Sequence, residues 1–175
     1  MQYQLLPIKI YGWCAVAWTE HGLAALTLPF TDPAAARAEL ASYLKTDLTL
    51  LLEHPDQHYL ITRLHQQLTN YFAGKQCNLN FPVDLTWCTP FQQRVLQYVK
   101  YLPYGKGSSY RQVAEIIGKP KASRAVGSAV GANRVLLVIP CHRVLRSDGR
   151  LGGFGGGIEW KKRLLRLEKV SWTEG

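Results

Sequence analysis

The sequence predicts an α+β fold in which a small N-terminal antiparallel sheet with helices precedes a mainly helical C-terminal domain containing a helix-turn-helix. Short β-prone segments separated by turn residues occupy the first 28 residues, whereas helix signals dominate from residue 88 onward. The length of 175 residues is enough for a buried core without disulfide or metal staples. We therefore expect an N-terminal supporting domain over residues 1–87 and a second domain over residues 88–175.

In the N-terminal half, strand signals come first and helix signals follow. The segments that predict an antiparallel meander are residues 2–10, 13–19 and 23–28. Asp32-Pro33 then opens a predicted helix over 33–45, and leucines at helical spacing predict another over 57–72 with Gly74 as its stop. Residues 76–87 are extended and contain proline, which suits a connection between the two halves.

The C-terminal half carries clear helix punctuation. Thr89, Pro90 and Gln92 form the pattern of a capping box with proline at the first helical position. The expected helices are residues 90–101, Ser108-Ser109 to Gly118, about 121–132 and about 158–169. Because two short helices flank a tight Gly/Pro turn, the middle pair predicts a helix-turn-helix.

Charge is distributed unevenly along the chain. The net charge is +9, but residues 1–87 hold five basic and seven acidic side chains, whereas residues 88–175 hold sixteen and five. Such a cationic half favours a polyanionic partner, because neutralised phosphates release counterions; the alternative is a basic surface that serves only solubility. No apolar run is long enough to span a membrane, and the N-terminus lacks a secretory signal, so we expect a soluble intracellular protein.

The predicted helix at 121–132 has two contrasting faces. Val126 and Val130 lie on one side. The opposite side carries one cation among residues with almost no side chain, namely Arg124, Gly127, Ser128 and Gly131. Each interior glycine costs a helix about 1 kcal/mol relative to alanine, so close approach of another surface is expected here. That surface is either a DNA minor groove, with Arg124 reaching between bases, or a second helix of the protein.

One of the four cysteines is a candidate reactive thiol. The four cysteines lie far apart, without zinc-ligand or disulfide spacing: Cys14, Cys77, Cys88 and Cys141. Cys141 follows the apolar run 136–140 and should be largely buried, which raises the pKa of a thiol and makes it inert unless a base is adjacent. His142 is that base candidate, although a Cys-His pair alone is weak evidence of catalysis.

A carboxylate from the last helix completes the candidate set. Trp160, Leu164 and Leu167 define the expected buried stripe, and Glu168 falls on its edge. The cations of this helix are expected to face outward, namely Lys161, Lys162, Arg163 and Lys169. A carboxylate beside an apolar stripe needs a partner, which is either a ring nitrogen of His142 or the guanidinium of a nearby arginine such as Arg143.

Several separated motifs resemble one family. The segment 139–144, Ile-Pro-Cys-His-Arg-Val, resembles the signature of the O6-alkylguanine-DNA alkyltransferases, also called methylated-DNA–protein-cysteine methyltransferases. The similarity extends over most of residues 88–168, in family order and spacing. It includes Tyr110-Arg111-Gln112-Val113-Ala114, Ser123-Arg124-Ala125-Val126-Gly127, Asn133, the glycine-rich loop 152–157 and Glu168. Residues 1–87 resemble the family only in general layout.

The resemblance implies a catalytic role for five residues. Cys141 is the alkyl acceptor, His142 takes its proton through a water, and Glu168 orients His142. Asn133 braces the turn beside the strand that carries the cysteine, and Tyr110 donates a proton to N3 of the departing guanine.

The resemblance also implies a DNA-binding helix and a base pocket. Arg124 fills the stack that the flipped base leaves, and the DNA-facing residues are Arg124, Ala125, Gly127, Ser128 and Gly131. The substrate pocket is formed by Val144, Phe154, Gly155 and Gly156. Three positions depart from the family pattern, because Phe154, Gly155 and Arg134 stand where relatives commonly have Tyr, Ser and Pro. A hydroxyl that could contact O6 is therefore absent, and the pocket is expected to admit larger alkyl groups.

The resemblance implies a stoichiometric methyltransferase of DNA repair. Its partner is double-stranded DNA carrying O6-alkylguanine, with O4-alkylthymine as a further candidate, and base flipping exposes the alkyl carbon. The thioether product has no good leaving group, so one turnover per chain is expected. We expect a monomer without cofactor, metal or membrane contact, in the cytoplasm, or in the nucleus of a eukaryote. The rival hypotheses are a non-catalytic helix-turn-helix protein that binds DNA and a cysteine hydrolase that uses Cys141 and His142.

Overall fold

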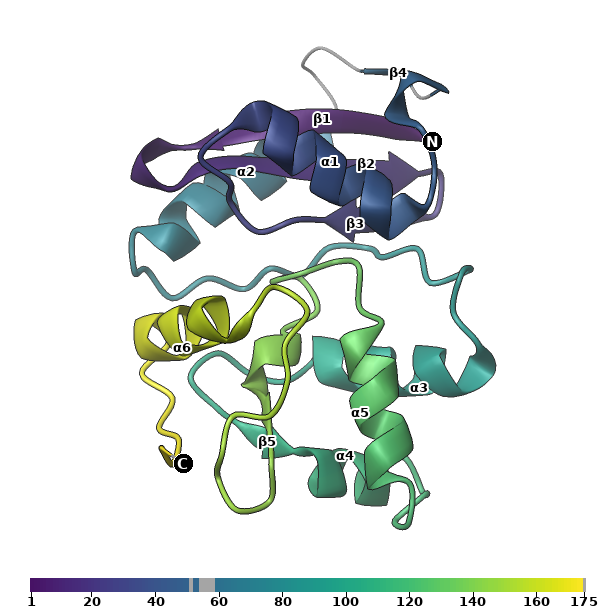
Figure 1. Ribbon diagram of the computed structural model, residues 1–175, viewed down its shortest axis with the longest axis vertical. Coiled ribbons are helices and arrows are strands. Elements are labelled where there is room, and N and C mark those ends of the chain that lie inside the picture. Colours follow the sequence, from purple (N-terminus) through teal and green to yellow (C-terminus); the bar gives the residue numbers. More distant parts are fainter. Residues whose placement is uncertain (51, 54–58, 175) are drawn as a thin grey trace. The chain divides into compact units, whose positions relative to one another are not determined.

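The computed structural model describes residues 1–50, 52–53 and 59–174, which are organised in two compact units (Figure 1). The first unit comprises Met1–Leu85 together with Arg134–Val138, and the second comprises Thr86–Asn133 and Ile139–Gly175. The segment Arg134–Val138 belongs to the first unit because its backbone pairs with Leu26. The N–H of Leu26 donates to the carbonyl of Arg134 at 2.8 Å, and the N–H of Leu136 donates to the carbonyl of Leu26 at 3.1 Å.

The first unit is built on the predicted antiparallel meander, which the structure confirms. Its strands are β1 (Gln2–Ile8), β2 (Gly12–Thr19), β3 (Gly22–Leu26) and β4 (Leu52–Glu53). β2 pairs antiparallel with both β1 and β3, and the two-residue β4 pairs parallel with β1, so that the strand order is β3-β2-β1-β4. A short 3-10 helix, Lys9–Tyr11, joins β1 to β2.

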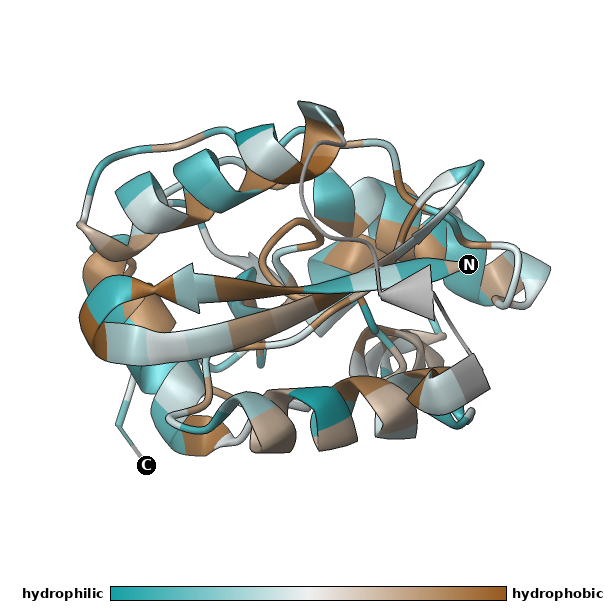
Figure 2. Ribbon diagram, turned by 90° about the horizontal axis from the view of Figure 1, so that it is seen from above, coloured by the Kyte–Doolittle hydropathy of each residue, from teal (hydrophilic) through white to brown (hydrophobic). Residues whose placement is uncertain are grey.

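Two helices cover the sheet of the first unit. α1 (Pro33–Leu44) begins at Asp32, whose carboxylate accepts from the N–H of Ala34 at 3.1 Å, and it contacts β2. α2 (Tyr59–Phe72) contacts β1; residues 57–58, with which the predicted helix starts, lie outside the described residues. α1 lies in front of the sheet in Figure 1 and α2 behind it, and Figure 2 shows a helix on each side of the sheet.

The second unit is mainly helical, as predicted. Its helices are α3 (Pro90–Lys100), α4 (Tyr110–Ile116), α5 (Ser123–Gly131) and α6 (Ile158–Leu167). The capping box at Thr89 is present, and a second one joins Ser109 and Gln112. Ser108–Ser109 form β5, which pairs parallel with β6 (Val144–Leu145), so α4 begins two residues after the predicted start.

α4 and α5 contact each other across a short connection. Gly118 follows α4 with φ +72°, a left-handed conformation that favours glycine and ends the helix sharply. Both helices also contact α3, which completes a small helical core. That this pair works as a DNA-binding helix-turn-helix stays a prediction. In the part of the chain that the structure describes, no helix has the length and apolar character needed to cross a membrane.

Candidate active site

Cys141 lies at the start of a short 3-10 helix, Cys141–Arg143, between Pro140 and β6. The expected position of this cysteine on a strand is wrong, because β6 begins only at Val144. The Cys141 side chain is buried, and the residue is only 3% exposed. Cys141 therefore lies in a turn and not in a sheet. Its thiol is close to Asn133, which follows α5 by two residues.

Asn133 holds the thiol of Cys141. Its Nδ2 donates to Sγ of Cys141 at 3.0 Å and to the carbonyl of Ile139 at 3.0 Å. Burial raises the pKa of the Cys141 thiol, whereas this hydrogen bond and the charge of Lys161 act in the opposite direction. The expected bracing of the turn by Asn133 is therefore accompanied by a direct contact with sulfur.

His142 is fully buried and has a defined hydrogen-bond partner. Its Nε2 lies 2.8 Å from Oε1 of Glu168. Burial lowers the pKa of His142, although the hydrogen bond and charge of Glu168 act against this shift, so the ring is neutral at pH 7. Nε2–H then donates to the carboxylate, which leaves Nδ1 as the basic nitrogen. This Nδ1 is buried and has no hydrogen-bond partner among the described residues.

Glu168 binds both partners that the sequence left open. It accepts from His142, and it also accepts from Arg143, whose Nε lies 2.7 Å from Oε2 and whose Nη2 lies 2.9 Å from Oε1. Burial raises the pKa of Glu168, but the hydrogen bonds from His142 and Arg143 outweigh burial and hold this pKa well below its usual range. Glu168 is therefore an ionised carboxylate inside the protein.

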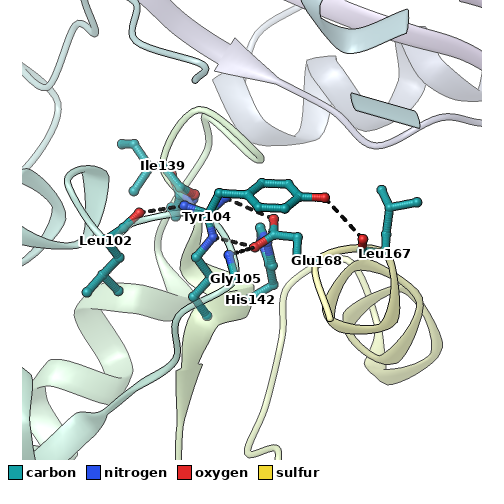
Figure 3. A network of polar contacts seen from close by, with 9 residues as sticks. Leu102, Tyr104, Gly105, Ile139, His142, Leu167 and Glu168 are labelled. Carbon is teal, nitrogen blue, oxygen red and sulfur yellow. Dashed lines mark hydrogen bonds and ion pairs between the residues drawn. The ribbon is translucent and has the colours of Figure 1, made fainter. Parts of the chain in front are cut away.

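The end of α6 is tied to the segment after α3 (Figure 3). The hydroxyl of Tyr104 donates to the carbonyl of Leu167 at 3.1 Å, and the N–H of Gly105 lies 3.4 Å from Oε2 of Glu168. The guanidinium of Arg143 stands 5.8 Å from the ring centroid of Tyr104. These contacts fix the carboxylate that faces His142.

The predicted outward position of Lys161 on α6 is wrong. An outward position is expected for this lysine, but the residue is fully buried. Its Nζ donates to the carbonyls of Val144 at 2.7 Å, Leu151 at 2.5 Å and Gly153 at 3.2 Å. Burial lowers the pKa of Lys161 to about 8. Carbonyl acceptors make the burial of this ammonium possible and join the glycine-rich loop to the chain after the cysteine.

The buried side of α6 is one residue away from the predicted stripe. Its buried positions are Lys161, Leu164 and Leu165, and Glu168, which directly follows the helix, is buried as well. They follow the spacing i, i+3, i+4 and i+7 of one helix face. A stripe drawn from apolar residues alone includes Trp160 and Leu167, which are half-buried, because it does not admit a lysine to the core. The spacing itself was the signal that could have identified Lys161.

Tyr110 lies between the glycine-rich loop and α5. Its hydroxyl donates to the carbonyl of Gly153 at 3.4 Å. A Cβ on Gly152 would lie 2.9 Å from this hydroxyl oxygen, and one on Gly127 would lie 3.8 Å from the ring. Gly152 also has φ +67°, so a side chain there would be both crowded and strained. Burial raises the pKa of Tyr110, as does the nearby Cys141, so the phenol keeps its proton at pH 7.

The remaining predicted pocket residues differ in burial. Phe154 stands edge-on to the His142 ring, with 6.4 Å between the ring centroids, and Val144 is fully buried. Gly155 is exposed and Gly156 is half-buried. Arg134 belongs to the first unit, where its carbonyl accepts from Leu26. The pocket roles of these residues stay predictions.

The two faces of α5 are arranged as the sequence predicts. Val126 is fully buried and Val130 is nearly so. The exposed residues of the helix include four of the five predicted DNA-facing positions, namely Arg124, Ala125, Ser128 and Gly131. The fifth, Gly127, is half-buried against Tyr110. The contact between Gly127 and Tyr110 of α4 agrees with the alternative in which a second helix approaches α5. The surface around Arg124 is exposed, and its contact with DNA stays a prediction.

Two family models match the chain. Residues 1–85 match the ribonuclease-like domain of 6-O-methylguanine DNA methyltransferase, and residues 90–170 match the DNA binding domain of the same family. Together these matches cover most of both units and include every residue of the candidate site.

Individual relatives agree with these matches. A methylated-DNA–protein-cysteine methyltransferase of Mycobacterium tuberculosis is 48% identical over 103 residues, which are 59% of this chain and 62% of that protein. The bifunctional transcriptional activator/DNA repair enzyme Ada of Escherichia coli is 40% identical over 171 residues, covering 96% of this chain and 45% of that protein. The chain thus spans about half the length of these curated relatives.

A solved structure extends the similarity to the whole chain. The crystal structure of Mycobacterium tuberculosis OGT in complex with DNA has a TM-score of 0.75 and 35% sequence identity. The superposition covers 97% of this chain and 93% of that one. The similarity therefore includes both the sheet-containing unit and the helical unit with its buried cysteine.

Proposed function

The chain belongs to the 6-O-methylguanine DNA methyltransferase family, and from this premise we propose that it repairs DNA by transferring the alkyl group of O6-alkylguanine to Sγ of Cys141. One observation carries the proposal: a buried thiol, held by Asn133 at 3.0 Å, adjoins a histidine whose Nε2 lies 2.8 Å from a buried carboxylate. This set contains a nucleophile, a base and a residue that orients the base.

The reaction is an in-line displacement at the alkyl carbon. The thiolate of Cys141 forms the S–C bond while the C–O6 bond breaks, and its electron pair leaves with the guanine. Nδ1 of His142 takes the thiol proton through a water molecule, and the ionised Glu168 stabilises the imidazolium that results. Tyr110 supplies a proton to N3 of the leaving guanine anion. Burial raises the pKa of Tyr110, so the phenol still carries this proton before the transfer.

Duplex DNA is the partner that this function requires. The exposed face of α5 around Arg124 fits the minor groove, and Arg124 would fill the stack after the base has left it. Flipping the nucleotide costs a few kcal/mol, which phosphate contacts from the cationic second half offset. The first unit supports the second, which binds DNA and holds the acceptor. The relative from Mycobacterium tuberculosis that was solved with DNA supports this choice of partner.

The chemistry makes each chain a single-use reagent. The thioether that forms on Cys141 has no good leaving group, and no step of the displacement needs a cofactor. Since each chain carries one acceptor thiol, one monomer repairs one lesion. The same site accepts O4-alkylthymine if the smaller base reaches the same position.

Intact-mass analysis tests the proposed function. After incubation with a duplex containing O6-methylguanine, we expect one methyl group per chain on Cys141. Cys141→Ala should remain unmodified while it still binds the duplex, whereas Cys88→Ala, which removes another buried thiol, should be methylated like the wild type. Methylation of the Cys141→Ala variant would eliminate the proposed acceptor. Binding without mass change would favour a non-catalytic DNA-binding protein, and repeated turnover of an ester or amide would favour a hydrolase.

A further inference from the structure

We propose that Arg143 is a positioning residue for alkyl transfer, because its guanidinium holds Glu168 ionised and correctly oriented so that His142 is kept as a neutral base. This inference rests on the proposed function and adds a residue to it. Arg143 does not touch the thiol of Cys141 in any described contact, so its effect is exerted through Glu168 and His142.

The geometry of Arg143 is that of a fixed clamp. Two of its nitrogens bind the two oxygens of Glu168, at 2.7 Å from Nε to Oε2 and at 2.9 Å from Nη2 to Oε1. The third nitrogen, Nη1, donates to the carbonyl of Leu102 at 2.5 Å. Since every nitrogen is engaged and the residue is only 7% exposed, the fork cannot turn without breaking several bonds.

Oε1 of Glu168 is shared between the clamp and the base. It accepts from Nη2 of Arg143 and from Nε2 of His142. The plane in which Arg143 holds the carboxylate therefore sets the direction from which Nε2–H can approach. That direction fixes the tautomer of His142 and keeps its Nδ1 as the nitrogen that can accept a proton.

A charge balance explains why a permanent cation is needed. A buried carboxylate requires a positive partner, and two groups within hydrogen-bond distance of Glu168 can supply one. Arg143 is charged at every working pH, so His142 does not have to be. Without Arg143, either His142 would become a lasting imidazolium or Glu168 would take up a proton. Neither state combines a free base at Nδ1 with a carboxylate that stabilises it.

The other groups around His142 raise or lower its pKa according to their charge. The charge of Glu168 raises the pKa of His142, whereas the charges of Arg143 and Lys161 lower it. Cys141 precedes it in the chain, and Phe154 presents an uncharged ring to it. Removal of the Arg143 charge therefore raises the pKa of His142. The transfer rate falls at low pH as His142 becomes protonated, and this fall, the acid limb of the pH profile, moves to higher pH.

The experiment compares Arg143→Met, Arg143→Lys and the matched control Arg146→Met. Arg146 is an arginine of the same unit whose side chain is 58% exposed and 3.6 Å from Asp148. The rate of benzyl transfer from free O6-benzylguanine is measured against pH, so that DNA binding does not enter. The pKa of His142 is measured separately by NMR on protein labelled at histidine.

We expect Arg143→Met to lower the rate at pH 7 by at least about tenfold and to move both the acid limb and the His142 titration upward by about one pH unit. Arg143→Lys keeps the charge but loses the fork, so the limb should stay in place while the plateau falls about threefold to tenfold. Arg146→Met should match the wild type. An unshifted limb in Arg143→Met, or a wild-type plateau in Arg143→Lys, would overturn the proposal.

A double-mutant cycle separates action through Glu168 from a general loss of structure. In the Glu168→Gln background, a residue that acts through Glu168 has little left to position, so adding Arg143→Met should change the rate by less than about twofold. A further loss equal to that in the wild-type background would refute action through Glu168. If Arg143→Met does not fold, the plateau of Arg143→Lys still decides the role of the fork. The NMR titration of His142 needs no reaction, so it decides the role of Arg143 even if the wild type proves unable to transfer an alkyl group.

Discussion

A single buried ammonium joins three stretches of chain around the candidate site. The carbonyls of Val144, Leu151 and Gly153 all accept from Nζ of Lys161. Substitution Lys161→Met preserves much of the volume but removes the ammonium donor from the carbonyls of Val144 and Leu151. The carbonyl of Gly153 still accepts from the hydroxyl of Tyr110. We expect the free energy of unfolding to fall by about 2–4 kcal/mol, because each unsatisfied buried polar group costs about 1–3 kcal/mol and loss of the buried charge recovers part of this. Urea unfolding followed by fluorescence measures the change.

The neighbouring lysine provides the control for this prediction. Nζ of Lys162 forms a surface ion pair with Glu159 at 3.1 Å, three residues earlier on α6. Lys162→Met should change stability by less than about 0.5 kcal/mol, since such pairs contribute little. Equal losses in the two variants would show that burial of Lys161 has no special effect on stability.

The reacting residues of the candidate site were more predictable from the sequence than the residues that hold them in place. Cys141, His142 and Glu168 could be selected because nucleophile, base and acid have distinctive side chains, and the structure does place His142 against Glu168. The burial of Lys161 was missed because a helical stripe drawn from apolar residues excludes a lysine. The sequence left His142 and Arg143 open as alternative partners of Glu168. That Glu168 binds both, with two hydrogen bonds from Arg143, could not be inferred because it depends on where two distant segments meet.

At the scale of secondary structure, α5 combines a buried face with an open one that carries Arg124. We expect Arg124→Ala to slow repair of O6-methylguanine in a duplex by at least about tenfold, because filling the vacated stack offsets part of a flipping cost of a few kcal/mol. Reaction with free O6-benzylguanine should be almost unchanged, since no base has to be flipped. Rates of methyl and benzyl transfer, read by intact mass, provide the comparison. Equal losses on both substrates would contradict the role in the stack.

Elements with local signals were predicted well, and elements formed by distant pairing were not. The helix start at Thr89 was readable because a capping box lies within four residues, and the meander because its strands follow one another. β4 has only two residues, and the pairing of β5 with β6 joins positions 36 residues apart, as Ser108 lies opposite Val144. Neither leaves a periodic pattern in the sequence.

At the scale of the whole molecule, the uneven charge predicts how DNA affinity depends on salt. Residues 88–175 hold sixteen basic side chains, against five in residues 1–87. If the second half neutralises phosphates, the logarithm of the association constant falls linearly with the logarithm of salt concentration, with a slope of about −0.9 for each phosphate contacted. Fluorescence anisotropy with undamaged duplex at several salt concentrations measures this slope.

Substitutions of two exposed lysines, one in each half of the chain, test which half causes the salt dependence. Lys121 lies just before α5, and Lys45 follows α1 in the other unit; both are exposed, so either can be changed without opening the core. Lys121→Gln should weaken binding and make the slope less steep by about one phosphate contact, whereas Lys45→Gln should leave both unchanged. A loss with Lys45→Gln that equals the loss with Lys121→Gln would mean that DNA responds to total charge. The assignment of DNA binding to the cationic second half would then be wrong.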